Sequence, residues 1–224
     1  MQSLDDMLQA SCWARQLSAD ELEQVKGDTV VRTVPAGQYV CMKGDAVEHW
    51  LGVVDGLVKM ASNWSSGKTT SFVGLSSGGW FGEGSLMKDE PRRYDVIALR
   101  ESQIAYMKRI RFQHLLDHSI PFNRFLLIQL NERLGQFIGM MEHERLLNTD
   151  ARLARCLASM FHPLLYPGSS LELRISQEEI GLLAGISRQR VNQALHVLEQ
   201  AGLVRVDYGT LTILDLDRLR CLGE

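Results

Sequence analysis

The sequence lacks the long apolar run of a membrane-spanning helix, and it lacks closely spaced cysteines. A membrane helix needs about 18 apolar residues in succession, and no stretch of this 224-residue chain approaches that length. The cysteines at positions 12, 41, 156 and 221 form no Cys-x-x-Cys pair, which argues against a disulfide framework and a structural zinc site. No basic residue precedes Arg15, so the N-terminus does not resemble a secretory signal. We therefore expect a soluble, cytoplasmic protein without a membrane partner.

An excess of basic charge is also missing. The chain has 24 lysines and arginines against 27 aspartates and glutamates. This balance excludes a polybasic tail and a uniformly basic coat, but a local basic patch remains compatible with it. Hydrophobic residues make up 45% and charged residues 23% of the chain, a globular composition rather than a disordered one. The length suits one large domain or two small ones.

Residues 28–108 have the pattern of a β domain. Runs of β-branched residues, such as Thr29–Val34, alternate with turn signals such as Pro35-Ala36-Gly37 and Lys43-Gly44-Asp45. Short strands separated by regular turns are typical of a sandwich, a barrel or a jelly roll. We therefore predict that this part of the chain forms a closed β structure.

The pattern becomes helical from Phe112 to about Glu144. Spacings of 3, 4, 3 and 4 residues form an apolar seam, which consists of Leu127, Leu130, Leu134, Phe137 and Met141. A second apolar set is formed by Phe122, Phe125, Leu126, Ile128 and Ile138. A helix that is apolar on two sides must be covered on two sides. We predict that one side packs on the β domain and that the seam pairs with a second copy. The alternative is one wide stripe inside a monomeric core.

The last third of the chain has the pattern of a winged helix-turn-helix. Ser176 and Glu179 form a capping box for a first helix. Gly185 stands where the turn needs a left-handed residue, and Ser187 can cap a second helix. The inward positions of the two helices are Ile180, Leu183, Val191, Ala194, Leu195 and Leu198. Two short apolar runs around Tyr208-Gly209 predict the hairpin of a wing.

The start of the second helix carries side chains that can read DNA bases. The predicted DNA-binding residues are Ser187, Arg188, Gln189, Arg190, Asn192 and Gln193. Arginine pairs with guanine, and glutamine or asparagine pairs with adenine, in the major groove. Recognition helices present their first turns to that groove. No acidic residue occurs between Glu179 and Glu199, which favours DNA over the alternative, the solvated face of a protein-binding winged helix.

The order of these parts resembles the CRP/FNR family of bacterial transcription regulators, from about Leu22 to Leu214. One matching segment runs from Ile180-Gly181 to Gly185-Ile186-Ser187-Arg188-Gln189-Arg190-Val191. The other is Gly79-Trp80-Phe81-Gly82-Glu83-Gly84-Ser85-Leu86-Met87, followed by Glu90-Pro91-Arg92-Arg93-Tyr94-Asp95-Val96, which is similar to a phosphate-binding cassette. The resemblance implies an α+β fold with a double-stranded, jelly-roll-like β-roll at residues 1–111. It further implies a long dimerisation helix at 112–146 and a winged helix-turn-helix at 147–224.

The resemblance also implies an effector pocket, which the sequence matches in part. The candidate effector-binding residues are Gly82, Glu83, Gly84, Ser85, Arg92, Arg93, Phe137 and Ile138. In relatives that bind cyclic nucleotides, the residue at Glu83 takes the ribose and the one at Arg92 takes the phosphate. Arg93 replaces a small hydroxyl residue. Phe137 and Ile138 replace residues that hold adenine, so we expect that cyclic AMP is not the effector. Alternatively, Glu83 and Arg92 pair with each other in a pocket that has lost its ligand.

Other cofactors and other classes of protein are less consistent with the sequence. Two N-terminal cysteines cannot supply the four thiolates of an iron–sulfur cluster. A haem group is not excluded by the sequence, because one of the isolated histidines could serve as an axial ligand. A jelly-roll metal enzyme needs several histidines in the β region, which holds only His49. No Gly-x-Ser-x-Gly elbow is present. We therefore expect no enzyme and no metal site. A nucleotide-binding module without a DNA function is the alternative. The expected partners are double-stranded DNA with an inverted repeat, a second copy, RNA polymerase and an unidentified effector.

Overall fold

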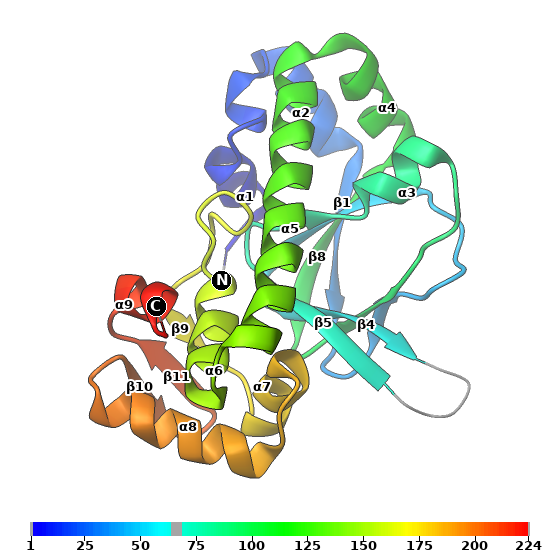
Figure 1. Cartoon of the computed structure of the whole chain (residues 1–224). Coiled ribbons are helices and arrows are strands. Elements are labelled where there is room, and N and C mark those ends of the chain that lie inside the picture. The colour runs from blue at the N-terminus through cyan, green and yellow to red at the C-terminus, as the bar shows by residue number, and fades with distance from the viewer. Residues whose placement is uncertain (1, 64–68, 224) are drawn as a thin grey trace.

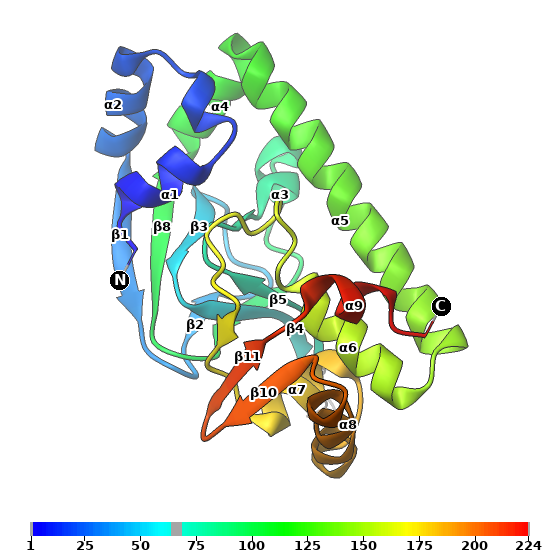
Figure 2. The same ribbon diagram turned by 90° about the vertical axis from the view of Figure 1, so that its left-hand side faces the viewer.

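The computed structural model describes residues 2–63 and 69–223. A β-roll lies beside one long helix, α5 (Ile120–Leu146), which runs down to a smaller unit that contains the chain's C-terminal end (Figures 1 and 2). The N-terminal helices are α1 (Leu4–Ala10), the 3-10 helix η1 (Ala14–Gln16) and α2 (Ala19–Gly27). Capping boxes begin both α-helices, at Ser3 with Asp6 and at Ser18 with Glu21. These N-terminal helices were not predicted, although the capping signals are present in the sequence.

The predicted β-roll is confirmed. One antiparallel sheet has the order β1-β8-β3-β6 and the other has the order β2-β7-β4-β5. The strands of the first sheet are β1 (Thr29–Val34), β8 (Ser102–Lys108), β3 (His49–Asp55) and β6 (Trp80–Phe81). Those of the second sheet are β2 (Tyr39–Cys41), β7 (Asp95–Ala98), β4 (Leu57–Asn63) and β5 (Thr69–Ser76). A short helix, α3 (Glu83–Lys88), follows β6.

Aromatic rings join the β-roll to the helices around it. Trp13, Trp50 and Trp80 are buried together, and the rings of Trp50 and Trp80 stack with centroids 4.3 Å apart. Phe122 of α5 meets Trp13 edge to face at 5.3 Å. Aromatic pairs in such geometries are worth about 0.5–1.5 kcal/mol each beyond the area they bury. The first half of α5 is therefore fixed firmly on the β-roll.

The predicted long helix is divided in the structure. Residues 109–118 form a separate helix, α4 (Arg109–His118), and α5 begins at Ile120. The side chain of Ser119 caps α5 by accepting a hydrogen bond from the backbone of Phe122, and Pro121 occupies the first turn. The periodicity on both sides of Ser119 is helical, so the pattern alone did not show the break. The domain boundary proposed at residue 111 consequently falls inside α4.

A second prediction about this helix is wrong in part. Phe122, Phe125 and Leu126 are buried, as a side facing the β-roll requires. Ile128 and Ile138, which were assigned to the same side, are exposed. At 100° per residue, Ile138 lies beside Leu134 on the seam rather than among the buried phenylalanines.

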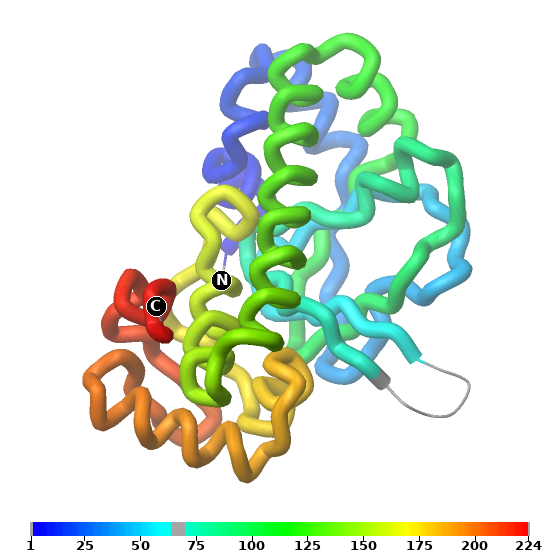
Figure 3. The backbone as a smooth tube through the Cα atoms, in the orientation of Figure 1, coloured from blue at the N-terminus to red at the C-terminus, as the bar shows by residue number. Residues whose placement is uncertain are grey.

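The C-terminal unit has the predicted winged helix-turn-helix. Its helices are α6 (Thr149–Ser159), α7 (Gln177–Ala184), α8 (Arg188–Gln200) and α9 (Leu216–Cys221). Its sheet joins β9 (Glu172–Leu173) to the hairpin of β10 (Val204–Asp207) and β11 (Thr210–Ile213). The tube in Figure 3 shows that the segment before β9 passes back beside α5 and the β-roll. Gly78 and Gly79 permit this close approach, because a side chain at Gly78 would lie 2.5 Å from the backbone of Gly168.

Candidate functional site

The turn between α7 and α8 fixes the orientation of α8. Gly185 has φ +66°, a left-handed conformation that favours glycine. The backbone of Ile186 donates to the carbonyl of Gly181 at 2.9 Å, and a Cβ at Gly181 would lie only 2.7 Å from the carbonyl oxygen of Ile186. Ser187 caps α8 by accepting from the backbone of Arg190 at 3.4 Å. These bonds hold the first turn of α8 at the surface in one direction.

The candidate DNA-binding side chains lie together on the exposed face of α8. Exposed positions are Arg188, Gln189, Arg190, Asn192 and Gln193, whereas the predicted inward positions Val191, Ala194, Leu195 and Leu198 are buried. The guanidinium of Arg190 donates to the amide of Gln193 at 3.2 Å. The amide of Asn192 donates to Gln177 of α7 at 3.3 Å. Gln177 was not predicted, because only the fold brings the start of α7 next to α8.

The wing is tied to the same helix. The carboxylate of Glu199 on α8 accepts a hydrogen bond from the backbone of Val206 on β10 at 2.9 Å. Tyr208 at the tip of the hairpin is fully exposed, and Gly209 takes the left-handed conformation that the turn needs. The helix and the wing therefore form one rigid exposed surface.

The cassette between β6 and β7 is closed by its own arginine. Gly82 has φ +88°, and a Cβ there would lie 2.0 Å from Nη1 of Arg92. The side chain of Arg92 is 5% exposed. It donates to the carbonyl of Gly82 at 3.3 Å and to the carbonyl of His49 at 2.5 Å. Two of the five N–H groups of Arg92 are thus bound to backbone carbonyls.

Glu83 is paired with an arginine that the sequence did not single out. The carboxylate of Glu83 is 3% exposed, and its ion-pair partner is Arg133 of α5, with Oε1 and Nε 3.8 Å apart. Arg133 also donates to the carbonyl of Trp80 at 2.7 Å. The alternative pairing of Glu83 with Arg92 is not among the ion pairs of residues 2–63 and 69–223.

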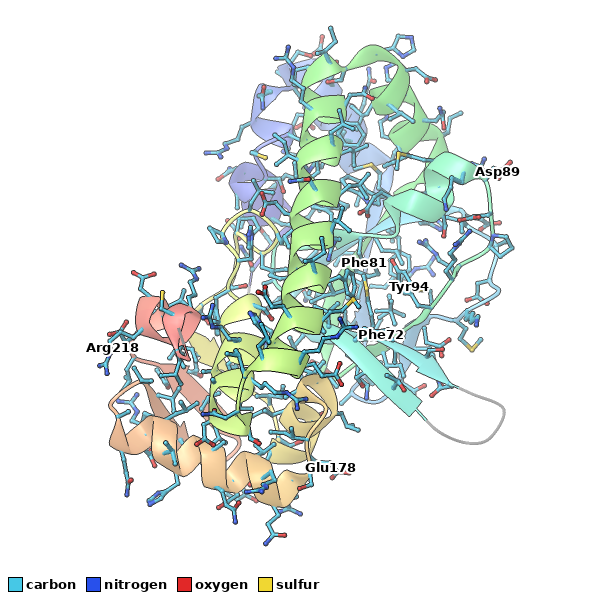
Figure 4. All side chains as sticks on the ribbon, viewed as in Figure 1. Phe72, Phe81, Asp89, Tyr94, Glu178 and Arg218 are labelled. Atoms are coloured by element: carbon cyan, nitrogen blue, oxygen red, sulfur yellow. The ribbon has the colours of Figure 1, made fainter. Side chains whose placement is uncertain are left out.

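The surroundings of Arg133 keep its charge. Burial alone lowers the pKa of this guanidinium, but the nearby Tyr166 and Glu83 outweigh burial, so the pKa lies above its ordinary value. Burial raises the pKa of Tyr94, and Glu83 raises it further. Figure 4 shows Tyr94 and Phe81 on the side of α5 that faces the β-roll. The pocket is consequently a buried polar cluster rather than an open cleft.

The other candidate effector residues are not gathered around Arg92. Arg93 is exposed and pairs with Glu90 at 2.8 Å, and the hydrogen bonds from Arg93 and Lys88 lower the pKa of Glu90 to about 2. The hydroxyl of Ser85 donates to the carbonyl of Pro91 at 3.4 Å. The remaining candidates lie elsewhere: Gly84 borders open space, and Phe137 and Ile138 are exposed on α5. The structure thus brings together Gly82, Glu83 and Arg92 only.

The seam of α5 is uncovered in the single chain. All of its members are exposed: Leu127, Leu130, Leu134, Phe137 and Met141. A contiguous row of large exposed apolar side chains is typical of an interaction surface. This exposure argues against the alternative in which the seam lies inside a monomeric core.

Two further properties of the described residues bear on function. No group of three or more histidine, cysteine, aspartate or glutamate side chains is placed to hold a metal ion within residues 2–63 and 69–223. In the same part of the chain, no helix combines the length and apolar character needed to cross a membrane.

Comparison with known proteins agrees with this architecture. The family model for the cyclic nucleotide-binding domain matches residues 31–119, and the model for the Crp-like helix-turn-helix domain matches residues 151–222. The cAMP-activated global transcriptional regulator Vfr of Pseudomonas aeruginosa is 26% identical over 81% of this chain and 88% of its own length. The cyclic AMP receptor protein of Thermus thermophilus is also 26% identical, over 81% of this chain and 82% of its own.

A similar fold is found in solved structures. FixK2 of Bradyrhizobium japonicum is 18% identical, covers 88% of this chain and 98% of its own, and has a TM-score of 0.72. The two family models match on either side of the long helix. The chain therefore belongs to the CRP/FNR family of DNA-binding transcription regulators, with a β-roll of the cyclic nucleotide-binding type.

Proposed function

We propose that the protein is a cytoplasmic homodimer that binds an inverted-repeat operator through α8 and acts with RNA polymerase. The observation that carries the proposal is the exposed row of Arg188, Gln189, Arg190, Asn192 and Gln193 on a helix whose other face is buried. In a two-fold dimer the two recognition helices meet half-sites about 34 Å apart. The proposed parts are an effector domain up to residue 111, a dimerisation helix at 112–146 and a DNA-binding domain at 147–224.

Selection from mixed genomic fragments, followed by binding titrations at fixed salt, tests this proposal. The selected sites should contain an inverted repeat. Arg188→Ala should weaken binding to that repeat by about 1–3 kcal/mol and relax one base position. Arg218→Ala is the matched control, because Arg218 lies on α9, away from α8 (Figure 4). If wild-type protein showed no preference over random DNA, the assignment of α8 would be refuted.

We further propose that the effector is not cyclic AMP. Arg92 already donates to two backbone carbonyls, so only part of its guanidinium is left for a phosphate. Phe137 and Ile138, the positions that the resemblance assigns to adenine, have apolar side chains without a hydrogen-bonding group and are exposed on α5. Arg93, which replaces the small hydroxyl residue, is exposed and pairs with Glu90 at 2.8 Å, so it adds no second charge beside Arg92.

Calorimetry with cyclic AMP and cyclic GMP, combined with operator titrations in their presence, tests the effector proposal. A ligand can switch the protein only if it binds one state better than the other. We expect no tight binding and no change in operator affinity. A dissociation constant in the low micromolar range, together with a tenfold gain in operator affinity, would contradict the proposal.

A further inference from the structure

A cavity of about 880 Å³ lies between the β-roll and the helix-turn-helix. Its walls come from β5, the second half of α5, α6 and the end of α7. Figure 1 shows these elements meeting where α5 leaves the β-roll and turns into α6. The volume falls within the range of about 300–1,000 Å³ that is usual for small-molecule sites. None of the cassette residues from Gly82 to Arg93 lines this cavity, whereas Phe137, which was also a candidate effector-binding residue, does.

Two glycines keep one wall of this cavity open. Gly135 and Gly139 are in the interior of α5, where glycine is less stable than alanine. A Cβ at Gly135 would meet nothing within 4 Å, and one at Gly139 would come no closer than 3.7 Å, to the ring of His143. No close packing in the described structure therefore requires glycine here. At 100° per residue, Gly139 lies about 140° from Leu134 of the seam. Phe137 and Met141, which also belong to the seam, line the cavity, so a second copy on the seam would border its outer side.

Polar atoms on the cavity wall lack partners. The hydroxyl of Ser71 on β5, a residue that is 9% exposed, has no hydrogen-bond partner in the described part of the chain. The same holds for both side-chain polar atoms of Gln136 on α5, which are also buried. Buried polar atoms are nearly always hydrogen-bonded in folded proteins. A molecule in the cavity would supply the missing partners.

The composition of the walls defines the chemistry of that molecule. Apolar side chains dominate the interior, among them Phe72, Met140, Met160 and Leu183. Phe72 is the labelled side chain where β5 meets the lower half of α5 in Figure 4. The body of the ligand should therefore be apolar.

The charged side chains on the walls favour an anion. Arg152 and Arg155 on α6 and Arg220 on α9 are half-buried, and Arg220 pairs with Asp217 at 3.1 Å. Of the two carboxylates on the walls, Glu132 is paired with His162 at 3.2 Å and Glu144 is exposed.

Arg152 is the cation best placed to receive the ligand. It donates to the carbonyl of Ala184 at 3.2 Å, and no carboxylate pairs with it among residues 2–63 and 69–223. A planar guanidinium binds a carboxylate through two parallel hydrogen bonds. We propose that this cavity is a binding site for an apolar monocarboxylate, whose carboxylate pairs with Arg152.

The position of Arg152 connects the site to the recognition surface. Ala184 is the last residue of α7, and Gly185 begins the turn that orients α8. A carboxylate on Arg152 would bind the same guanidinium that holds this carbonyl. The ligand would contact both the long helix and the helix-turn-helix, so it could favour one arrangement of the two. Binding itself does not depend on the proposed DNA function and can be measured without DNA.

Calorimetric titration of the full chain tests the site. The probes are dodecanoate, below its micellar concentration, and 2-naphthoate, which distinguish an acyl chain from an aromatic ring. Dodecyltrimethylammonium is the probe of opposite charge. We expect saturable binding of at least one acid, with one molecule per chain, and at least tenfold weaker binding of the cation. Absence of saturable binding by both acids, or equal binding of the cation, overturns the proposal.

Two substitutions locate the ligand. Gly139→Leu fills the open wall and improves helix propensity, so it should weaken binding at least tenfold while the thermal midpoint stays or rises. Arg152→Met keeps the apolar stem and removes the charge, so it should also weaken binding at least tenfold. Arg218→Met, on an exposed arginine outside the cavity, should change affinity less than twofold. If one of the two cavity variants, Gly139→Leu or Arg152→Met, does not fold, the other alone decides the test. Wild-type affinity in a folded Gly139→Leu or Arg152→Met variant places the ligand elsewhere and overturns the proposal.

Discussion

Replacing Leu134 by glutamate separates the stability of the dimer from that of the single chain. The side chain of Leu134 is 58% exposed within one protomer. Substitutions at such positions usually change the free energy of unfolding by less than about 0.5 kcal/mol. The Leu134→Glu chain should therefore fold with a nearly unchanged thermal midpoint at concentrations where both proteins are monomeric. Any large effect must come from the contact with a second copy.

The expected effect on dimerisation is much larger. Full burial of one leucine is worth about 1.5–3 kcal/mol, and the two-fold axis doubles the loss to about 3–6 kcal/mol. Each glutamate would also be buried without a partner, at a cost of several kcal/mol. Because 1.4 kcal/mol corresponds to a tenfold change in affinity, the dissociation constant should rise by at least about a hundredfold.

Analytical ultracentrifugation over a range of concentrations measures this change. Ile110→Glu is the matched control, because Ile110 is 72% exposed and lies on α4 outside the seam. The control should remain a dimer, whereas Leu134→Glu should sediment as a monomer with native circular dichroism. A folded Leu134→Glu dimer of wild-type affinity would show that the interface lies elsewhere on the molecule.

Two further predictions concern the glycines and the cysteines. Gly185→Ala forces a side chain into a left-handed residue with φ +66°, so thermal unfolding should show a loss of about 1–2 kcal/mol. Gly135→Ala, the same change inside α5, should raise the free energy of unfolding by about 1 kcal/mol. If both substitutions stabilised the protein, or both destabilised it, the assignment of strain to Gly185 would be contradicted. Burial raises the pKa of Cys156 to about 12, and the thiolate is the reactive form. At pH 8 iodoacetamide should modify the exposed Cys221 before the half-buried Cys156, as peptide mass spectrometry would show, and early modification of Cys156 would contradict its raised pKa.

The sequence predicted those parts of the fold that are encoded by neighbouring residues. The capping box at Ser176 and the turn at Gly185 are local signals, and the structure confirms both. The division of the long helix at Ser119 was missed because the apolar period continues on both sides, although Ser119 and Pro121 together are a signal for the start of a helix. The helices before residue 28 were missed although Ser18 and Glu21 carry the same capping signal. There the local signal was present and was not used.

The DNA-binding face could be predicted from the sequence, whereas the contacts of the cassette could not, because they join residues that are distant in the chain. The exposed face of α8 follows from one helical period, so Arg188 and its neighbours could be assigned from spacing alone. The partner of Glu83 could not be assigned in this way, because Arg133 lies 50 positions further along the chain. Nor does a sequence show that Arg92 turns toward backbone carbonyls while Arg93 turns toward Glu90. Such choices depend on which groups the completed fold brings within hydrogen-bonding distance.

Helix α5 joins these sites, because different faces of it contact different parts of the molecule. Arg133 contacts Glu83 and the backbone of Trp80 in the β-roll. Leu134, the next residue, is exposed on the seam, and Gly135 lines the cavity beside the helix-turn-helix. Successive residues of a helix point about 100° apart, so three consecutive positions face three different surroundings. A rotation or shift of α5 that improves one contact must therefore change the other two. The proposed control of DNA binding needs a coupling of this kind, and a rigid helix shared by the pocket, the dimer seam and the helix-turn-helix supplies it.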